Sequence, residues 1–109
     1  MLKRKYRLSA RSRLQNPSVV HTPFFTMRYI KNNLLYSRFG FIVSKKVDKR
    51  AVVRNTVKRK VRLFVENMRE KIVSGYDLLF SLKKSAINED FTSLSNYMEN
   101  IFRKEKLLT

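Results

Sequence analysis

The sequence predicts a single α+β domain in which two helices cover one face of a β-sheet. The chain has 109 residues, the length of one domain, and 43% of them are hydrophobic, enough for one packed core. Short alternating segments before residue 45 and an apolar run at 76–82 are typical of strands. Two longer segments, 51–74 and 90–107, repeat apolar residues with the period of a helix. Because each helix has one apolar stripe, both are expected on the same face of the sheet, which leaves the other face at least partly open.

The first 22 residues are expected to form a basic N-terminal arm or a short helix. This segment has few apolar residues, and they show no clear period. Pro17 and Pro23 bound an irregular stretch, because proline disfavours helix at its own position and at the residue before it.

Two strands are predicted next. Residues 24–30 alternate between the two faces of a strand, and residues 31–33 are a turn signal. Residues 34–44 are therefore expected to return as the second strand of a hairpin. Gly40 lies in the middle of this strand, where glycine marks either a bulge or the close approach of another backbone.

The remaining elements are a helix, a strand and a helix. The helix at 51–74 has an apolar stripe and is followed directly by Gly75, a suitable C-cap. The strand at 76–82 follows it. In the last helix, acidic and capping residues at 88–90 and basic residues near the C-terminal end both suit the helix dipole.

The net charge of +17 indicates a polyanionic partner. Nucleic acid is the first candidate and an anionic membrane surface the second. The absence of cysteine excludes disulfides, thiolate metal sites and a cysteine nucleophile, and the presence of only two glycines excludes glycine-rich phosphate loops. No apolar run is long enough to span a membrane and no secretory signal is recognisable, so a cytoplasmic protein is expected.

Catalysis by the chain itself is not expected. His21 is the only histidine and lies in the irregular segment. The carboxylates follow no spacing that predicts a catalytic pair or a metal site.

The most informative segment is the basic stretch 54–62, in which five of the nine residues are Arg or Lys. Like charges at helical spacing repel one another, so this face is better suited to a phosphate backbone than to water, although a solvated basic face is the common alternative. Two lysines at the end of the preceding strand lead into the same helix. The predicted RNA-binding residues are Lys45, Lys46, Arg54, Asn55, Lys58, Arg59 and Arg62.

The same residues carry a resemblance to a known family. The segment Phe39-Gly40-Phe41-Ile42-Val43-Ser44-Lys45-Lys46-Val47, followed by Ala51-Val52-Val53-Arg54-Asn55-Thr56-Val57-Lys58-Arg59, resembles the bacterial ribonuclease P protein family. Gly75-Tyr76-Asp77 and the C-terminal helix are also similar to that family, and the likeness covers residues 23–108 in order. Three features depart from the family pattern. Thr56 replaces the second Arg of Arg-Asn-Arg, the aromatic pair of the first helix is missing, and Arg28 stands where the cleft strand often has an aromatic residue.

The resemblance implies a fold and a function. The fold is an αβββαβα sandwich of a four-stranded sheet with a left-handed βαβ crossover, like domain 2 of ribosomal protein S5. The function is that of the protein subunit of an endoribonuclease whose catalyst is an RNA with Mg²⁺, with no cofactor bound by the protein alone. One protein per ribonuclease P RNA would hold the 5′ leader of precursor tRNA in a cleft beside the basic helix. The expected cleft residues are Phe24, Arg28, Gly40, Ile42 and Ser44.

Three other classes are considered. A small ribosomal-type or chaperone RNA-binding protein would bind structured RNA without assisting leader removal. A free-standing nuclease would require the catalytic carboxylates or histidines that the sequence lacks. A DNA-binding helix protein would usually be a symmetric dimer, for which the sequence shows no feature.

Overall fold

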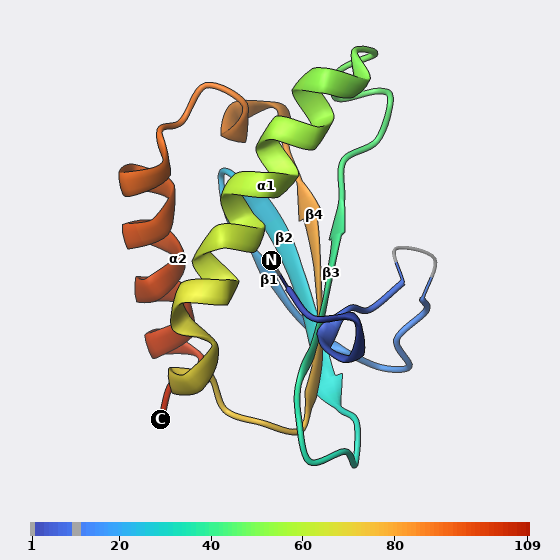
Figure 1. Cartoon of the computed structure of the whole chain (residues 1–109), viewed down its shortest axis with the longest axis vertical. Helices are drawn as coiled ribbons and strands as arrows, with labels where there is room; N and C mark the ends of the chain where they lie inside the picture. The colour runs from blue at the N-terminus through green and yellow to red at the C-terminus, as the bar shows by residue number, and fades with distance from the viewer. Residues whose placement is uncertain (1, 10–11) are drawn as a thin grey trace.

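The computed structural model describes residues 2–9 and 12–109, and it contains one four-stranded mixed sheet and two α-helices (Figure 1). The elements are β1 Ser18–His21, β2 Phe25–Lys31, β3 Arg38–Ile42, α1 Ala51–Met68, β4 Tyr76–Leu82 and α2 Phe91–Lys104. Three short 3-10 turns, Arg4–Tyr6, Arg69–Lys71 and Lys84–Ala86, complete them. The α+β class and the four-stranded sheet are confirmed.

The hairpin expected from residues 24–30 and 34–44 is wrong. The strand order is β1-β2-β4-β3, so β4 separates the two strands. It pairs antiparallel with β2 and parallel with β3. Leu78, Leu79 and Phe80 of β4 are buried in succession, and burial on both faces suits a central strand.

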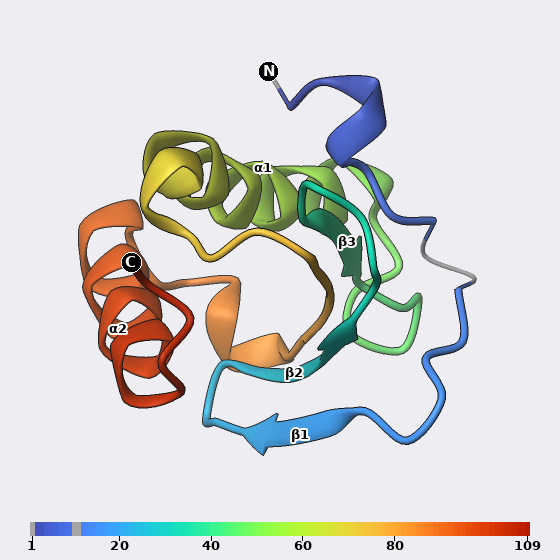
Figure 2. The ribbon, with the colours of Figure 1, turned by 90° about the horizontal axis from the view of Figure 1, so that it is seen from below.

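The connection from β3 through α1 to β4 has the uncommon hand. β3 and β4 run parallel, and α1 lies on the same face of the sheet as α2. Seen from that side with both strands pointing up, β4 lies to the left of β3 (Figures 1 and 2). The crossover is therefore left-handed, although most such units are right-handed.

Both helices cover the same face of the sheet, as expected. The rings of Phe41 and Phe102 stack on Phe80 at centroid distances of 5.5 and 6.0 Å. Phe80 and Phe102 have no exposed surface. The apolar stripe of α1 supplies Val57, Val61, Phe64 and Val65 to this core.

The ends of three elements differ from the sequence prediction. The strand expected at 34–44 covers only Arg38–Ile42, and the last helix ends at Lys104 rather than at residue 107. The first helix stops at Met68 rather than at residue 74, because the chain turns to pair with its C-terminal tail. There the Val73 N–H donates to the Leu107 carbonyl at 2.7 Å. Gly75, with φ of 87°, is thus not a helix C-cap but part of the bend before β4. The second helix begins as expected, because the Asp90 side chain accepts a hydrogen bond from the Ser93 N–H.

The N-terminal segment, residues 2–9, lies along the outer edge of β3 (Figure 2). The Leu8 N–H donates to the Phe39 carbonyl at 2.8 Å. A Cβ atom on Gly40 would lie 2.8 Å from the Leu8 carbonyl oxygen, and β3 pairs with β4 through Gly40 without a break in register. Of the two readings of this glycine, close approach of a backbone is therefore correct.

The part of the chain assigned to an arm or short helix contains more structure than the residue pattern predicts. Residues 18–21 form β1, which pairs with β2 at the sheet edge opposite β3. Where the implied fold has its first helix, the described residues form only the 3-10 turn Arg4–Tyr6; residues 10 and 11 lie outside the description.

Candidate nucleic-acid interface

A hollow of about 300 Å³ lies between α1, β3 and the N-terminal segment. Lys58 and Arg62 line it from α1, and Arg7 lines it from the N-terminal segment. The apolar lining consists of Leu2, Leu8, Phe39, Gly40 and Phe41. Three cations around an apolar floor are the ingredients of a site for an extended nucleic-acid strand.

The cations on this side of α1 are available to a ligand. The guanidinium of Arg62 lies 5.8 Å from the ring centroid of Phe41, which fixes its position through a cation–π contact. Within the described ranges, no carboxylate forms an ion pair with Lys58, Arg59 or Arg62. Exposed Asn55 lies on the same helix. Glu66 lines a hollow together with Arg59 and Arg62, so it offsets part of this charge, and this side of α1 keeps a net positive charge.

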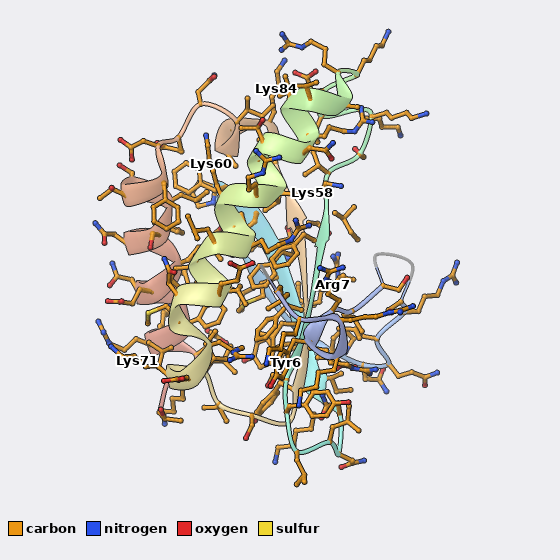
Figure 3. The ribbon with its side chains drawn as sticks, in the orientation of Figure 1. Tyr6, Arg7, Lys58, Lys60, Lys71 and Lys84 are labelled. Carbon is orange, nitrogen blue, oxygen red and sulfur yellow. The ribbon has the colours of Figure 1, made fainter. Side chains whose placement is uncertain are left out.

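Two other cations of the basic stretch have structural roles. Nη1 of Arg54 donates to the carbonyls of Asp48 and Lys49 at 2.9 and 2.8 Å, and so ties α1 to the preceding connector. Nζ of Lys60 donates to the carbonyls of Ile87 and Glu89 and holds the loop before α2. Figure 3 places Lys58 and Lys60 on different sides of α1. The charge count of the segment thus overstates the number of cations that face outward.

The connector before α1 presents Lys45 and Lys46. Both side chains are exposed, and the turn is closed by a hydrogen bond from the Val47 N–H to the Ser44 carbonyl. Side-chain and backbone hydrogen bonds from Arg50 lower the pKa of Asp48 to about 2. The one carboxylate of the connector is therefore ionised and paired with Arg50.

The expected cleft residues fall into two groups. Arg28 and Gly40 both pair with Leu79 in the sheet, so they lie in one row on the face that the helices leave open. Gly40 is buried beneath Leu8, whereas Ile42 is half-buried near the end of β3 and Ser44 is exposed beyond it.

Phe24 lies apart from that row. Its ring packs edge-on against Tyr97 of α2 at 5.2 Å, on the helical side of the sheet. The structure therefore does not bring Phe24 together with the other cleft residues.

Sequence reasoning missed an ion pair on the open face. Arg38 and Asp77 are partners in the β3–β4 ladder and form two hydrogen bonds, of 2.8 and 2.6 Å. Asn32 donates to the same carboxylate. Burial acts to raise the pKa of Asp77, but the hydrogen bonds from Arg38 and Asn32 outweigh it and hold that pKa below its ordinary value. Only the pairing of β3 with β4 identifies this ion pair, and the hairpin prediction paired β3 with β2 instead.

The site also depends on N-terminal residues that the sequence prediction did not include. Arg7 lines the hollow, and its Nε donates to the Leu2 carbonyl at 2.9 Å. Leu2 and Leu8 are buried. Two leucines within a basic arm are the signal that could have indicated that this segment packs against the rest of the domain.

The described residues contain no cluster of three His, Asp or Glu side chains suitable for a metal ion. No helix in the described part of the chain is long and apolar enough to cross a membrane.

Comparison with known proteins gives a consistent result. Residues 2–106 match the family model described as Ribonuclease P. A protein of Thermoanaerobacter sp. (strain X514), called "Ribonuclease P protein component", is 35% identical over 92 residues, which cover 84% of this chain and 78% of that protein. The protein of the same name from Fusobacterium nucleatum is 38% identical over 82 residues, covering 72% and 73%.

Two solved structures have similar folds. The RNase P protein from Thermotoga maritima in complex with 1-(4-fluorophenyl)-2-thiourea has a TM-score of 0.72 and 27% identity, over 79% of this chain and 83% of that one. The RNase P protein of Staphylococcus aureus has a TM-score of 0.78 over 95% and 98% of the two chains. At 22% identity, the second likeness shows the fold alone.

Proposed function

The chain belongs to the ribonuclease P protein family, and we propose that it acts as the protein subunit of a ribonucleoprotein that removes the 5′ leader of precursor tRNA. The observation that carries this proposal is the family match over residues 2–106. The outward cations of α1 support it, because a subunit of this kind must bind RNA.

The RNA-binding surface would comprise the outward side of α1 and the connector before it. Lys58, Arg59 and Arg62 are free to contact phosphates, and Lys45 and Lys46 extend the charge beyond the N-terminal end of the helix. Each phosphate contact releases counterions, so the charge of +17 favours a large salt-dependent affinity. We assign this surface to the ribonuclease P RNA, with one protein per RNA.

The leader would enter the hollow between α1, β3 and the N-terminal segment. Arg7, Lys58 and Arg62 can neutralise the phosphates of an extended strand there. Beyond the hollow, Arg28 and Ile42 offer the part of the sheet face that Leu8 does not cover. A single strand is bound well by such a combination of basic and apolar groups.

We place the chemical step in the RNA subunit. The described residues contain no cluster of three His, Asp or Glu side chains for Mg²⁺. The only histidine, His21, lies on β1 with Nδ1 3.5 Å from the Thr26 hydroxyl, at the sheet edge opposite β3 and the hollow. The Mg²⁺ ions of the reaction would therefore be held by RNA, while this chain binds and orients the two RNAs. The cytoplasm is the expected location of such a complex.

Reconstitution tests the proposal. The full chain is mixed with a bacterial ribonuclease P RNA and a precursor tRNA at low Mg²⁺, and cleavage is compared with that by each component alone. Cleavage at the mature 5′ end only in the mixture is the expected result. Tight RNA binding without stimulated cleavage would instead indicate a structural or chaperone RNA-binding protein. Cleavage by the protein alone would place an active site in this chain.

A further inference from the structure

A second hollow lies on the other side of the N-terminal segment, near the C-terminal end of α1. Its volume is about 210 Å³. Tyr6, Tyr36 and Arg69 contribute to its lining, and Glu70 is exposed at its rim. Tyr6 lines this hollow, whereas Arg7 and Leu8 line the first one. The N-terminal segment thus separates the two (Figure 3 shows Tyr6 and Arg7).

Two tyrosines and two cations meet at this hollow. The rings of Tyr6 and Tyr36 are arranged edge to face with centroids 5.7 Å apart. The guanidinium of Arg69 lies 4.5 Å from the Tyr6 centroid, and Nζ of Lys5 lies 5.0 Å from it and 5.4 Å from the Tyr36 centroid. Three separate segments of the chain, the N-terminal segment, the β2–β3 loop and the turn after α1, supply these side chains.

Both tyrosines keep part of their binding capacity. Cations already lie over the ring faces, so a stacking base would take the place of Lys5 or Arg69 there. Each ring is only half-buried, and neither hydroxyl forms a hydrogen bond within the part of the chain that the structure describes. The floor is different, because the Ser37 hydroxyl already donates to the Val73 carbonyl and accepts from the Tyr76 N–H. Recognition at this hollow therefore depends mainly on the ring faces and the cations.

We propose that this hollow binds one unstacked nucleobase of a single-stranded RNA, together with its adjoining phosphate. The base would stack on Tyr6 or Tyr36, and Lys5 and Arg69 would contact the phosphate. Aromatic platforms with flanking cations bind single strands in this way, because every base has a π-face.

The charges at the hollow favour this ligand over a purely anionic one. Lys5 and Arg69 lie over the same ring, so their charges are at most about 10 Å apart, within a Debye length at moderate salt. A phosphate that both cations contact would relieve their repulsion. Glu70 offsets part of the positive potential, so stacking must contribute to the affinity besides charge.

This inference rests on the proposed function only in taking RNA as the partner. The base could come from the ribonuclease P RNA or from the precursor tRNA. The chemistry is the same, and binding measurements with each RNA separately distinguish the two sources.

The test uses the full chain and a short single-stranded RNA. An adenosine pentanucleotide is titrated into the labelled protein and followed by NMR, alongside a pentanucleotide with the same phosphates but one abasic position. We expect shifts of the Tyr6 and Tyr36 ring signals with the first RNA and much smaller ones with the second. Tyr6→Leu and Tyr36→Leu should each weaken binding of the pentanucleotide about 5- to 30-fold, the loss of one stacked base.

Matched variants separate stacking from folding. Tyr6→Phe and Tyr36→Phe keep the ring and should bind nearly as the unchanged protein does. Amide exchange at Leu8 reports whether the N-terminal segment stays docked in each variant. If Tyr36→Leu keeps Leu8 protected and binds RNA as before, the proposal is wrong.

The two proposals can fail separately. Stimulated precursor-tRNA cleavage by the unchanged protein, with no ring shifts in the titration, would overturn this inference and leave the proposed function standing. Ring shifts and weaker binding by the leucine variants, without stimulated cleavage, would support this site and overturn the proposed function.

Discussion

The two sides of α1 carry cations that serve different purposes. On one side, Lys60 donates to two backbone carbonyls near α2, and near the N-terminal end Arg54 does the same for the connector. On the other side, Lys58 and Arg62 line an open hollow and have no ion pair among the described residues. Residues of one type, a few positions apart, thus either bond to carbonyls of the fold or remain available to a ligand. Their partners, rather than their charge, distinguish the two roles.

The largest expected effect comes from removing the outward cations together. The triple substitution Lys58→Gln, Arg59→Gln and Arg62→Gln should lower RNA affinity roughly 100-fold and reduce the slope of log K against log salt by about 2 to 3. Glutamine is a good helix former, so the free energy of unfolding should change by less than about 0.5 kcal/mol. Fluorescence anisotropy at several salt concentrations measures the slope. An unchanged slope would show that RNA does not bind this side.

Lys60→Met, on the other side of the helix, should reduce stability and leave RNA affinity nearly unchanged. The carbonyls of Ile87 and Glu89 lose a charged donor, so the free energy of unfolding should fall by about 1–2 kcal/mol. Methionine keeps the length of the side chain and its helix propensity. RNA affinity should change by less than about threefold, since only the general charge is reduced. Urea denaturation and the same anisotropy assay measure both quantities, and a large affinity loss with unchanged stability would break the distinction between the two sides.

Gly40→Ala tests whether the hollow beside Lys58 needs the N-terminal segment. The new methyl group would lie 2.8 Å from the Leu8 carbonyl oxygen and from Cδ1 of Leu79, closer than atoms pack. We expect a loss of about 1–2 kcal/mol and faster amide exchange at Leu8, because the segment must move away. Ile42→Val, on the same face of β3, is the control and should leave Leu8 protected. Slow exchange at Leu8 in the alanine variant would mean that the sheet, rather than the segment, yields.

Local patterns predicted both helices and three of the four strands, and missed β1, for a physical reason. Alternation over 24–30, the apolar run at 76–82 and the stripe on α1 each reflect burial of one element against the core. The resulting pattern of apolar residues can be recognised from a few consecutive positions of the sequence. The bounds of β4 match the prediction, and both helices lie on one face as their stripes require.

The strand order could not be derived in the same way. Nothing in β2 or β3 indicates that β4 will lie between them, because the choice depends on competition among all the strands for the central position. The resemblance to a family supplied the crossover hand that general rules would have reversed.

The candidate site was predictable in part. Outward cations such as Lys58 follow from helical spacing, whereas the structural roles of Arg54 and Lys60 depend on carbonyls that only the fold brings close. The burial of Leu2 and Leu8 was missed because isolated apolar residues in a basic arm show no helical or strand period.

The smallest expected effect concerns the ion pair between Arg38 and Asp77 on the open face of the sheet. The pKa of Asp77 is held below its ordinary value by Arg38 and Asn32, despite burial. The folded state therefore binds this proton less readily than the unfolded chain does. The stabilisation is fully present above the ordinary carboxyl pKa and is lost as the pH falls through the lower pKa of the folded state.

Asp77→Asn should consequently cost only about 1 kcal/mol at neutral pH, because the Arg38 side chain is 35% exposed and its ion pair is screened by water. The variant should also lose less stability than the unchanged protein in urea denaturation between pH 5 and pH 2. Its remaining acid sensitivity would come from Asp48 and Asp90, whose pKa values are also lowered by local hydrogen bonds. The triple glutamine variant of α1 should keep the full acid sensitivity, because its three cations have no carboxylate partner among the described residues. Equal acid sensitivity in Asp77→Asn and the unchanged protein would show that the pair with Arg38 does not contribute to stability.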